Sequence, residues 1–132
     1  MIGERGGCPE SGFTTLEAVL VFPVLLLLLM LIIQFALWYH ADDLVTAAAQ
    51  DGVRAARVEG ATAVDGSERA NELLDQTGRS IVEGRDVQVS RDADVARVEV
   101  RGTCIALVPF LHLPVHAVAE SSTERFRGRL GR

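Results

Sequence analysis

The sequence predicts an α+β protein, in which a long N-terminal membrane-spanning helix continues into a small extracytoplasmic head with a short helix and a three-stranded antiparallel sheet. Two observations support this fold. The apolar run from Ala18 to Tyr39 contains one polar side chain, Gln34, and would form a helix about 33 Å long, enough to cross a hydrocarbon core. Beyond Gly84 the hydrophobic period becomes two residues, which is the period of half-buried strands.

The first element is the membrane anchor. Residues 1–12 are polar and glycine-rich and are interpreted as a leader peptide that is removed by cleavage, and residues 13–40 as the transmembrane helix. The apolar run is longer than the roughly 7–15 residues of a secretory signal peptide, so we expect a retained anchor. Pro23 lies inside the run and removes one backbone donor, which predicts a kink in the helix.

The helix is expected to continue through residues 41–59, which open the head at residues 41–132. Small side chains recur at helical spacing along one face of this second half, and they predict close helix packing at Ala48, Ala49, Gly52, Arg54 and Ala56, with Val45 and Val53 beside them. Either the sheet of the same chain or the helix of a neighbouring subunit would cover this face. We favour the first arrangement, with the long helix as the spine of the head.

The rest of the head follows from shorter patterns. Ser67 is a candidate N-cap for a helix over residues 67–77, with Ala70, Leu73, Leu74 and Thr77 facing inward. Alternating apolar residues predict strands at about 86–90, 95–102 and 115–121. The apolar segment Ile105–Pro114 between the last two strands is expected to be a loop with a buried or membrane-facing side.

Composition excludes several functions. The net charge of −5, from 13 basic and 18 acidic residues, argues against nucleic-acid binding. Cys104, His112 and His116 could be drawn as metal ligands, but Pro114 prevents the two histidines from sharing a regular helix face. The sequence has neither a phosphate-binding loop nor a nucleophile motif. We therefore expect no metal, no cofactor and no enzymatic activity.

One carboxylate stands out at the head of the apolar run. Glu17 would be costly in lipid, and a lone acid at this place is a candidate functional residue. It follows Gly12 and Phe13 at a spacing that resembles a type IV prepilin signal. In that class a peptidase cuts after the glycine, here between Gly12 and Phe13, and the acid pairs with the terminal amine of an adjacent subunit during assembly. The simpler interpretation is that Glu17 snorkels to the headgroups.

Several residues together resemble the TadE-like family of pseudopilins or minor pilins from tight-adherence (Flp) pilus systems. They are Gly12, Glu17, Pro23, the leucine run, Gln34-Phe35 and the segment Ala48–Ala56 with its Gly52-Val53-Arg54. The resemblance implies a bacterial pilus-assembly or secretion component, anchored in the cell membrane. Its implied partners are membrane lipid, a prepilin peptidase, and other pilin-like subunits with their assembly machinery.

The positive-inside rule favours a cytoplasmic N-terminus only weakly. It counts basic residues, and Arg5 precedes the span, whereas Asp42 and Asp43 after the span contribute little to the rule. The cleavage signal supports the same orientation and an extracytoplasmic head. The alternative is an uncleaved single-pass membrane protein whose outer domain is a protein-binding module.

Overall fold

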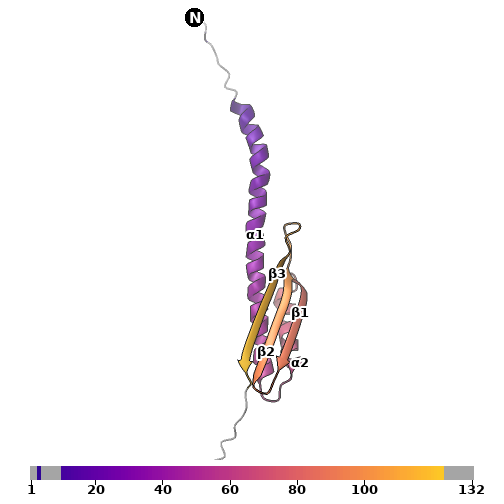
Figure 1. The fold of residues 1–132 in the computed structure, drawn as a ribbon. Helices are drawn as coiled ribbons and strands as arrows, with labels where there is room; N and C mark the ends of the chain where they lie inside the picture. The colour runs from indigo at the N-terminus through magenta and orange to yellow at the C-terminus, as the bar shows by residue number, and fades with distance from the viewer. Residues whose placement is uncertain (1–2, 4–9, 124–132) are drawn as a thin grey trace, which may run out of the picture.

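The computed structural model of the chain describes residue 3 and residues 10–123. Figure 1 shows one long helix, α1, with a small head packed along its C-terminal half. The head contains a short helix, α2, and a three-stranded antiparallel sheet, so the predicted α+β fold is confirmed. Most of the predicted leader lies outside the described residues.

Helix α1 (Glu10–Arg57) has 48 residues and is about 72 Å long at the standard rise. It runs through Pro23 without interruption and ends two residues before Glu59, the expected end. Arg54 and Arg57 lie in its last turn, where positive charge complements the helix dipole. Gly60 then adopts a left-handed φ of 81°, which lets the chain turn away from the helix axis.

The second helix begins earlier than the sequence pattern predicts. Helix α2 (Ala63–Leu73) is capped by Thr62, whose hydroxyl accepts a hydrogen bond from the backbone N–H of Asp65. The Asp65 carboxylate accepts in return from the Thr62 N–H at 2.6 Å, which completes a capping box. The predicted N-cap, Ser67, is therefore wrong and lies inside the helix. A π-helical turn, η1 (Leu74–Gly78), follows, and Thr77 faces solvent rather than the core.

The sheet contains β1 (Val82–Arg91), β2 (Val95–Cys104) and β3 (Leu113–Ser122), in that spatial order. Both pairings are antiparallel, and Val98 of β2 lies opposite Val89 on one side and Ala119 on the other. Each strand is longer than predicted. In β1 the register shifts between Glu83 and Asp86, and Gly84 there has a φ of 58°. This irregularity breaks the alternating pattern and hides the start of the strand in the sequence.

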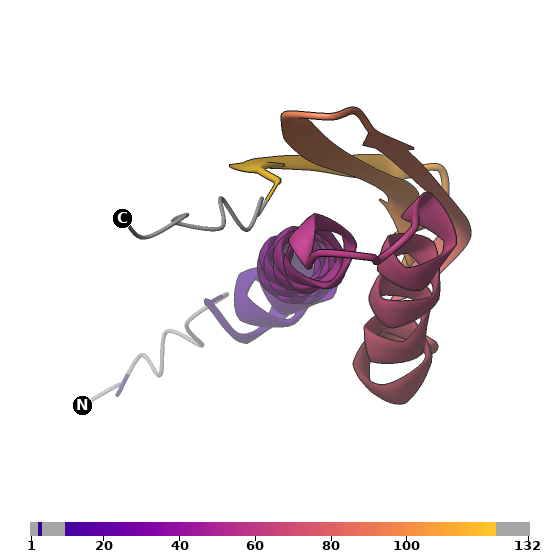
Figure 2. The same ribbon diagram turned by 90° about the horizontal axis from the view of Figure 1, so that it is seen from below.

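Helices α1 and α2 cover the same face of the sheet, as the view along α1 shows (Figure 2). Every second residue of β2 faces these helices, and Ala96, Val98 and Val100 are fully buried. The remaining hydrophobic core comes from both helices and the other strands: Ala41, Val45, Ala48, Ala49, Val53, Ala56, Ala70, Leu74, Val82, Cys104, Val115 and Ala117. The core therefore lies between the second half of α1 and the sheet, and the first half of α1 extends beyond it.

Candidate functional site

The N-terminal half of α1 exposes a continuous apolar surface. Among the described residues one helix is long and apolar enough to cross a membrane, and its most apolar window has a mean hydropathy of 3.0 with none of the window buried. Large side chains on this surface are about half exposed or more, including Leu16, Leu20, Phe22, Val24, Leu25, Leu27 and Ile32. Exposed apolar surface of this extent requires lipid or another apolar partner. It is the membrane anchor.

The predicted cleavage and assembly residues lie at the start of this surface. Helix α1 already begins at Glu10, so the peptide bond between Gly12 and Phe13 is in its first turn. The side chain of Glu17 is exposed, beside Leu16, Leu20 and Val21. Within the part of the chain that the structure describes, Glu17 has no ion-pair or hydrogen-bond partner. An apolar helix thus presents a carboxylate, and none of the described residues supplies a positive charge to pair with it.

Another polar group of the anchor, the Gln34 amide, has hydrogen-bond partners for both its nitrogen and its oxygen. Gln34 is 0% exposed, although it lies inside the apolar run. Its Nε2 donates to the carbonyl oxygen of Ile105 at 3.0 Å. Its Oε1 accepts from the backbone N–H groups of Leu107 at 2.6 Å and Val108 at 3.2 Å. One amide therefore satisfies three backbone groups of the β2–β3 loop, residues 105–112, and fixes this loop against α1.

Trp38 makes a similar connection one turn further along α1. Its indole N–H donates to the carbonyl oxygen of Pro114, at the start of β3, over 3.1 Å. Tryptophan is enriched where a helix leaves the membrane, because its ring is amphipathic. Gln34 and Trp38 together attach the head to the part of α1 that belongs to the apolar run.

The predicted helix-packing residues divide into two groups. Ala48, Ala49, Gly52 and Ala56 lie on the buried side of α1, against the sheet and α2. A Cβ atom at Gly52 would lie 2.9 Å from the Gly66 carbonyl oxygen, so the two helices cross closely there. Arg54 was expected in the same set, but it lies on the exposed side and pairs with Asp51 at 3.6 Å. Arg54 therefore takes no part in the core packing.

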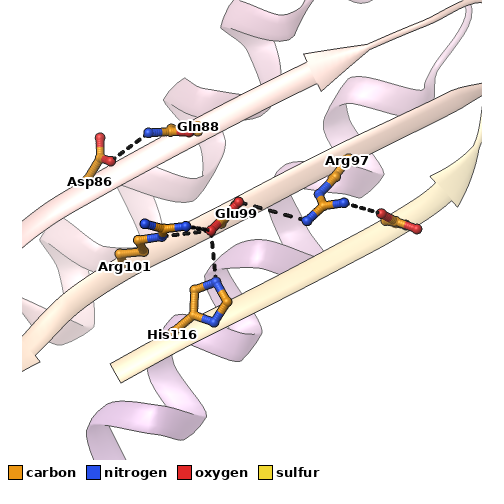
Figure 3. A network of polar contacts seen from close by, with 7 residues as sticks. Asp86, Gln88, Arg97, Glu99, Arg101 and His116 are labelled. Carbon is orange, nitrogen blue, oxygen red and sulfur yellow. Dashed lines mark hydrogen bonds and ion pairs between the residues drawn. The ribbon is translucent and has the colours of Figure 1, made fainter. Parts of the chain in front are cut away.

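The opposite face of the sheet carries charge (Figure 3). Glu99 of β2 accepts hydrogen bonds from Arg101 and from the imidazole of His116, whose Nε2 is 2.9 Å away. Arg97 bridges to Glu120 at 3.0 Å. The hydrogen bonds from Arg101 and then His116 lower the pKa of Glu99 below its ordinary value. This network joins neighbouring strands and resembles ordinary cross-strand pairing.

The residues considered as metal ligands do not converge. Cys104 is buried in the core, and burial raises the pKa of its thiol. His116 faces the other side of the sheet, toward Glu99, and His112 is exposed at the end of the β2–β3 loop. Among the described residues, no three His, Cys, Asp or Glu side chains form a group suited to a metal ion.

Sequence reasoning missed the roles of Gln34 and Trp38. The available signal was the burial problem of a lone amide in an apolar helix, because such a group must find hydrogen-bond partners. Its partners are backbone atoms of a loop more than seventy positions later. The nearest of them in sequence, the carbonyl oxygen of Ile105, is 71 positions away. No local pattern identifies them.

Comparison with known proteins finds a family match along nearly the whole of α1. Residues 12–54 match the family model described as TadE-like protein, which covers about a third of the chain. The match begins at Gly12 and ends at Arg54, within α1. No curated protein and no solved structure matches the chain. The expected resemblance is confirmed for residues 12–54, which are similar to TadE-like proteins and which lie in the helix that is apolar enough to anchor the chain in a membrane.

Proposed function

We propose that the chain is a pseudopilin or minor pilin of a Tad-type pilus or of a related secretion system. In this proposal the N-terminus is cytoplasmic and the head, residues 41–132, is extracytoplasmic. A prepilin peptidase removes residues 1–12 by cutting after Gly12, and the anchor at residues 13–40 then joins other pilin-like subunits. The observation that carries the proposal is the family match to residues 12–54, a range that includes the proposed cleavage site and the anchor.

The first turn of α1 is compatible with proteolysis. The first four N–H groups of a helix have no partner within the helix, so helix ends fray readily. Gly12 weakens this turn further because glycine gains the most backbone freedom on unwinding. A peptidase could therefore open the backbone around the Gly12–Phe13 bond without disturbing the head.

Glu17 supports an assembly role on physical grounds. A carboxylate at the edge of the lipid is costly alone, and it becomes tolerable when a positive charge pairs with it. Cleavage would create such a charge, the amine of Phe13, on every mature subunit. We propose that Glu17 of one subunit binds the Phe13 amine of its neighbour.

Processing is tested by the mass of the chain after extraction from membranes that contain the peptidase. We expect a new terminus at Phe13 for the wild-type protein. Gly12→Val should block the cut, because a branched side chain obstructs binding before the scissile bond. Gly12→Ala is the matched control and should still be cut. A Phe13 terminus on Gly12→Val would refute the site. A retained Met1 or Ile2 in the wild-type protein would instead favour the uncleaved protein-binding alternative.

Assembly is tested with Glu17→Ala. Membrane insertion should be unchanged or improved, because even a central charge costs about 2.5–3.5 kcal/mol on insertion scales and a peripheral one less. Co-purification with pilin-like subunits should fall. Glu68→Ala, at an exposed glutamate of α2, serves as the control and should assemble normally. Normal assembly of Glu17→Ala would show that this carboxylate only snorkels to the headgroups.

A further inference from the structure

We propose that the β2–β3 loop inserts its apolar tip into the lipid leaflet on the head's side of the membrane, beside α1. The head would then contact the bilayer at two points, through the helix and through this loop. The inference depends on α1 being the membrane anchor, and it holds for either orientation of the chain. Its ligand is the boundary between lipid headgroups and acyl chains.

The depth of the loop follows from its contacts with α1. Gln34 precedes Trp38 by about 6 Å along the helix axis. The amide oxygen of Gln34 accepts a hydrogen bond from the N–H of Leu107 at 2.6 Å, so the loop backbone lies on the N-terminal side of Trp38 along α1. Trp38 marks the expected interface, because aromatic side chains gather at the headgroup level. Figure 1 shows the loop projecting from the head toward the N-terminal end of α1. The loop thus lies at the level of the spanning segment.

The composition of the loop suits lipid. Its first seven residues carry no charge: Ile105, Ala106, Leu107, Val108, Pro109, Phe110 and Leu111. Phe110 is 97% exposed and has a φ of 71°, an uncommon conformation for a bulky residue. This conformation directs an aromatic ring away from the head, where it adds nothing to the core. A strained, outward-facing aromatic residue is understandable if its binding partner is outside the chain.

Several backbone polar groups of the loop also have hydrogen-bond partners within the chain, which an environment with little water requires. Irregular backbone is tolerated near lipid only when its polar groups find partners. Leu107 and Val108 donate to Gln34, and Leu111 donates to the Val108 carbonyl oxygen at 3.2 Å. Pro109 has no N–H. The groups that remain can bind water at the interface, where apolar segments penetrate about 5–10 Å.

Lipid is favoured over a protein partner because the loop lies beside apolar surface of α1 that lipid must cover. Ile32, Ile33 and Phe35 of α1 are exposed apolar residues at the level of the loop. They belong to the surface that the membrane must cover, so lipid already surrounds the loop on this side. A neighbouring subunit would have to displace this lipid to reach Phe110.

The test uses the full-length protein in phosphatidylethanolamine–phosphatidylglycerol vesicles at a high lipid-to-protein ratio. Phe110→Cys and Leu107→Cys, in a Cys8→Ser background, are labelled with a nitroxide. Collision rates are then measured with oxygen, which enters lipid, and with a polar nickel chelate, which does not. Leu25→Cys reports lipid, Ser90→Cys reports water at the far end of the head, and protein without an added cysteine reports labelling of Cys104.

We expect both loop labels to collide with the nickel chelate about tenfold less often than the Ser90 label, because a polar complex is excluded from apolar surroundings. Their collision rate with oxygen should approach that of the Leu25 label. A water-like result at both positions would overturn the proposal. Low collision rates with both reagents would also overturn it, because they would show a protein contact at the loop.

Discussion

At the scale of single residues, Gln34 holds the head at a defined position along a helix that is otherwise apolar there. A helix that must be apolar cannot easily hold a second segment, because apolar contacts with lipid and with protein are nearly equivalent. A buried amide with three backbone partners provides direction and specificity in this setting. Trp38 adds a further bond, to the Pro114 carbonyl oxygen. The position of the head along α1 is therefore set by hydrogen bonds as well as by packing.

Replacement of Gln34 tests this role. Gln34→Leu would leave the N–H groups of Leu107 and Val108 without their acceptor, and unsatisfied buried groups cost about 1–3 kcal/mol each. We expect faster amide hydrogen exchange across residues 105–111 in detergent micelles or vesicles. Gln50→Leu, at an exposed position of the same helix, is the control and should leave this exchange unchanged. Equal exchange in wild type and Gln34→Leu would show that packing alone holds the loop.

At the scale of elements, α1 and α2 approach each other closely where they cross. A Cβ atom at Gly66 would lie 2.8 Å from the Ala56 Cβ, and one at Gly52 would meet Ala70 and Val98 at 3.1 and 3.2 Å. Glycine at both positions allows the two helices to cross while both still reach the sheet. The small-residue face of α1 is therefore filled within the chain, which excludes for this structure the arrangement with a neighbour's helix on that face.

Gly52→Ala should consequently destabilise the head. The added methyl group has no space without movement of α2 or β2, and overpacking of a core typically costs about 1–3 kcal/mol. Thermal unfolding of the full chain in detergent, followed by circular dichroism, measures the effect. Ala47→Leu is the matched control, because Ala47 is exposed on the same helix and leucine is tolerated there. If both variants melted like the wild type, the crossing would be looser than described.

At the scale of the whole molecule, three carboxylates link the stability of the head to pH. Hydrogen bonds from Arg101 and His116 lower the pKa of Glu99, those from Thr62 lower the pKa of Asp65, and the one from Arg85 lowers the pKa of Asp75. The folded head binds fewer protons than the unfolded chain near these values. Its stability is therefore fully present above the ordinary carboxylate pKa values and is lost as the pH falls through the lowered ones.

Glu99→Gln should remove part of this dependence. We expect the free energy of unfolding of the wild type to fall more steeply below about pH 4.5, the ordinary glutamate value, than that of the variant. Asp65 and Asp75 keep the remaining slope in both proteins. Denaturant unfolding across a pH series measures it, with Glu68→Gln as the control outside the network. Parallel curves for wild type and Glu99→Gln would mean that its bonds with Arg101 and His116 do not persist in solution.

Most of this architecture could be predicted from the sequence, because helix and strand periods are local. The apolar run, the small-residue face and the alternating residues of β2 each lead to the element that is observed. Local sequence signals failed to place the start of α2 and the start of β1. The capping box uses Asp65 rather than the commoner Glu or Gln, and the irregularity at Gly84 interrupts the β1 pattern. The junction at Gln34 and Trp38 could not be predicted, since it depends on contacts between distant segments.

Because α1 is one uninterrupted helix from Glu10 to Arg57, it also fixes the angle around its axis between side chains that are far apart along it. Each residue turns the helix by about 100°, so Glu17 and Gln34 point in directions roughly 100° apart around the axis. Gln34 is hydrogen-bonded to the β2–β3 loop, and the direction of the Glu17 carboxylate relative to the head is thereby fixed. A subunit captured through Glu17 would present one defined side of its head to the neighbour, and inserting one residue between the two positions would turn that side away.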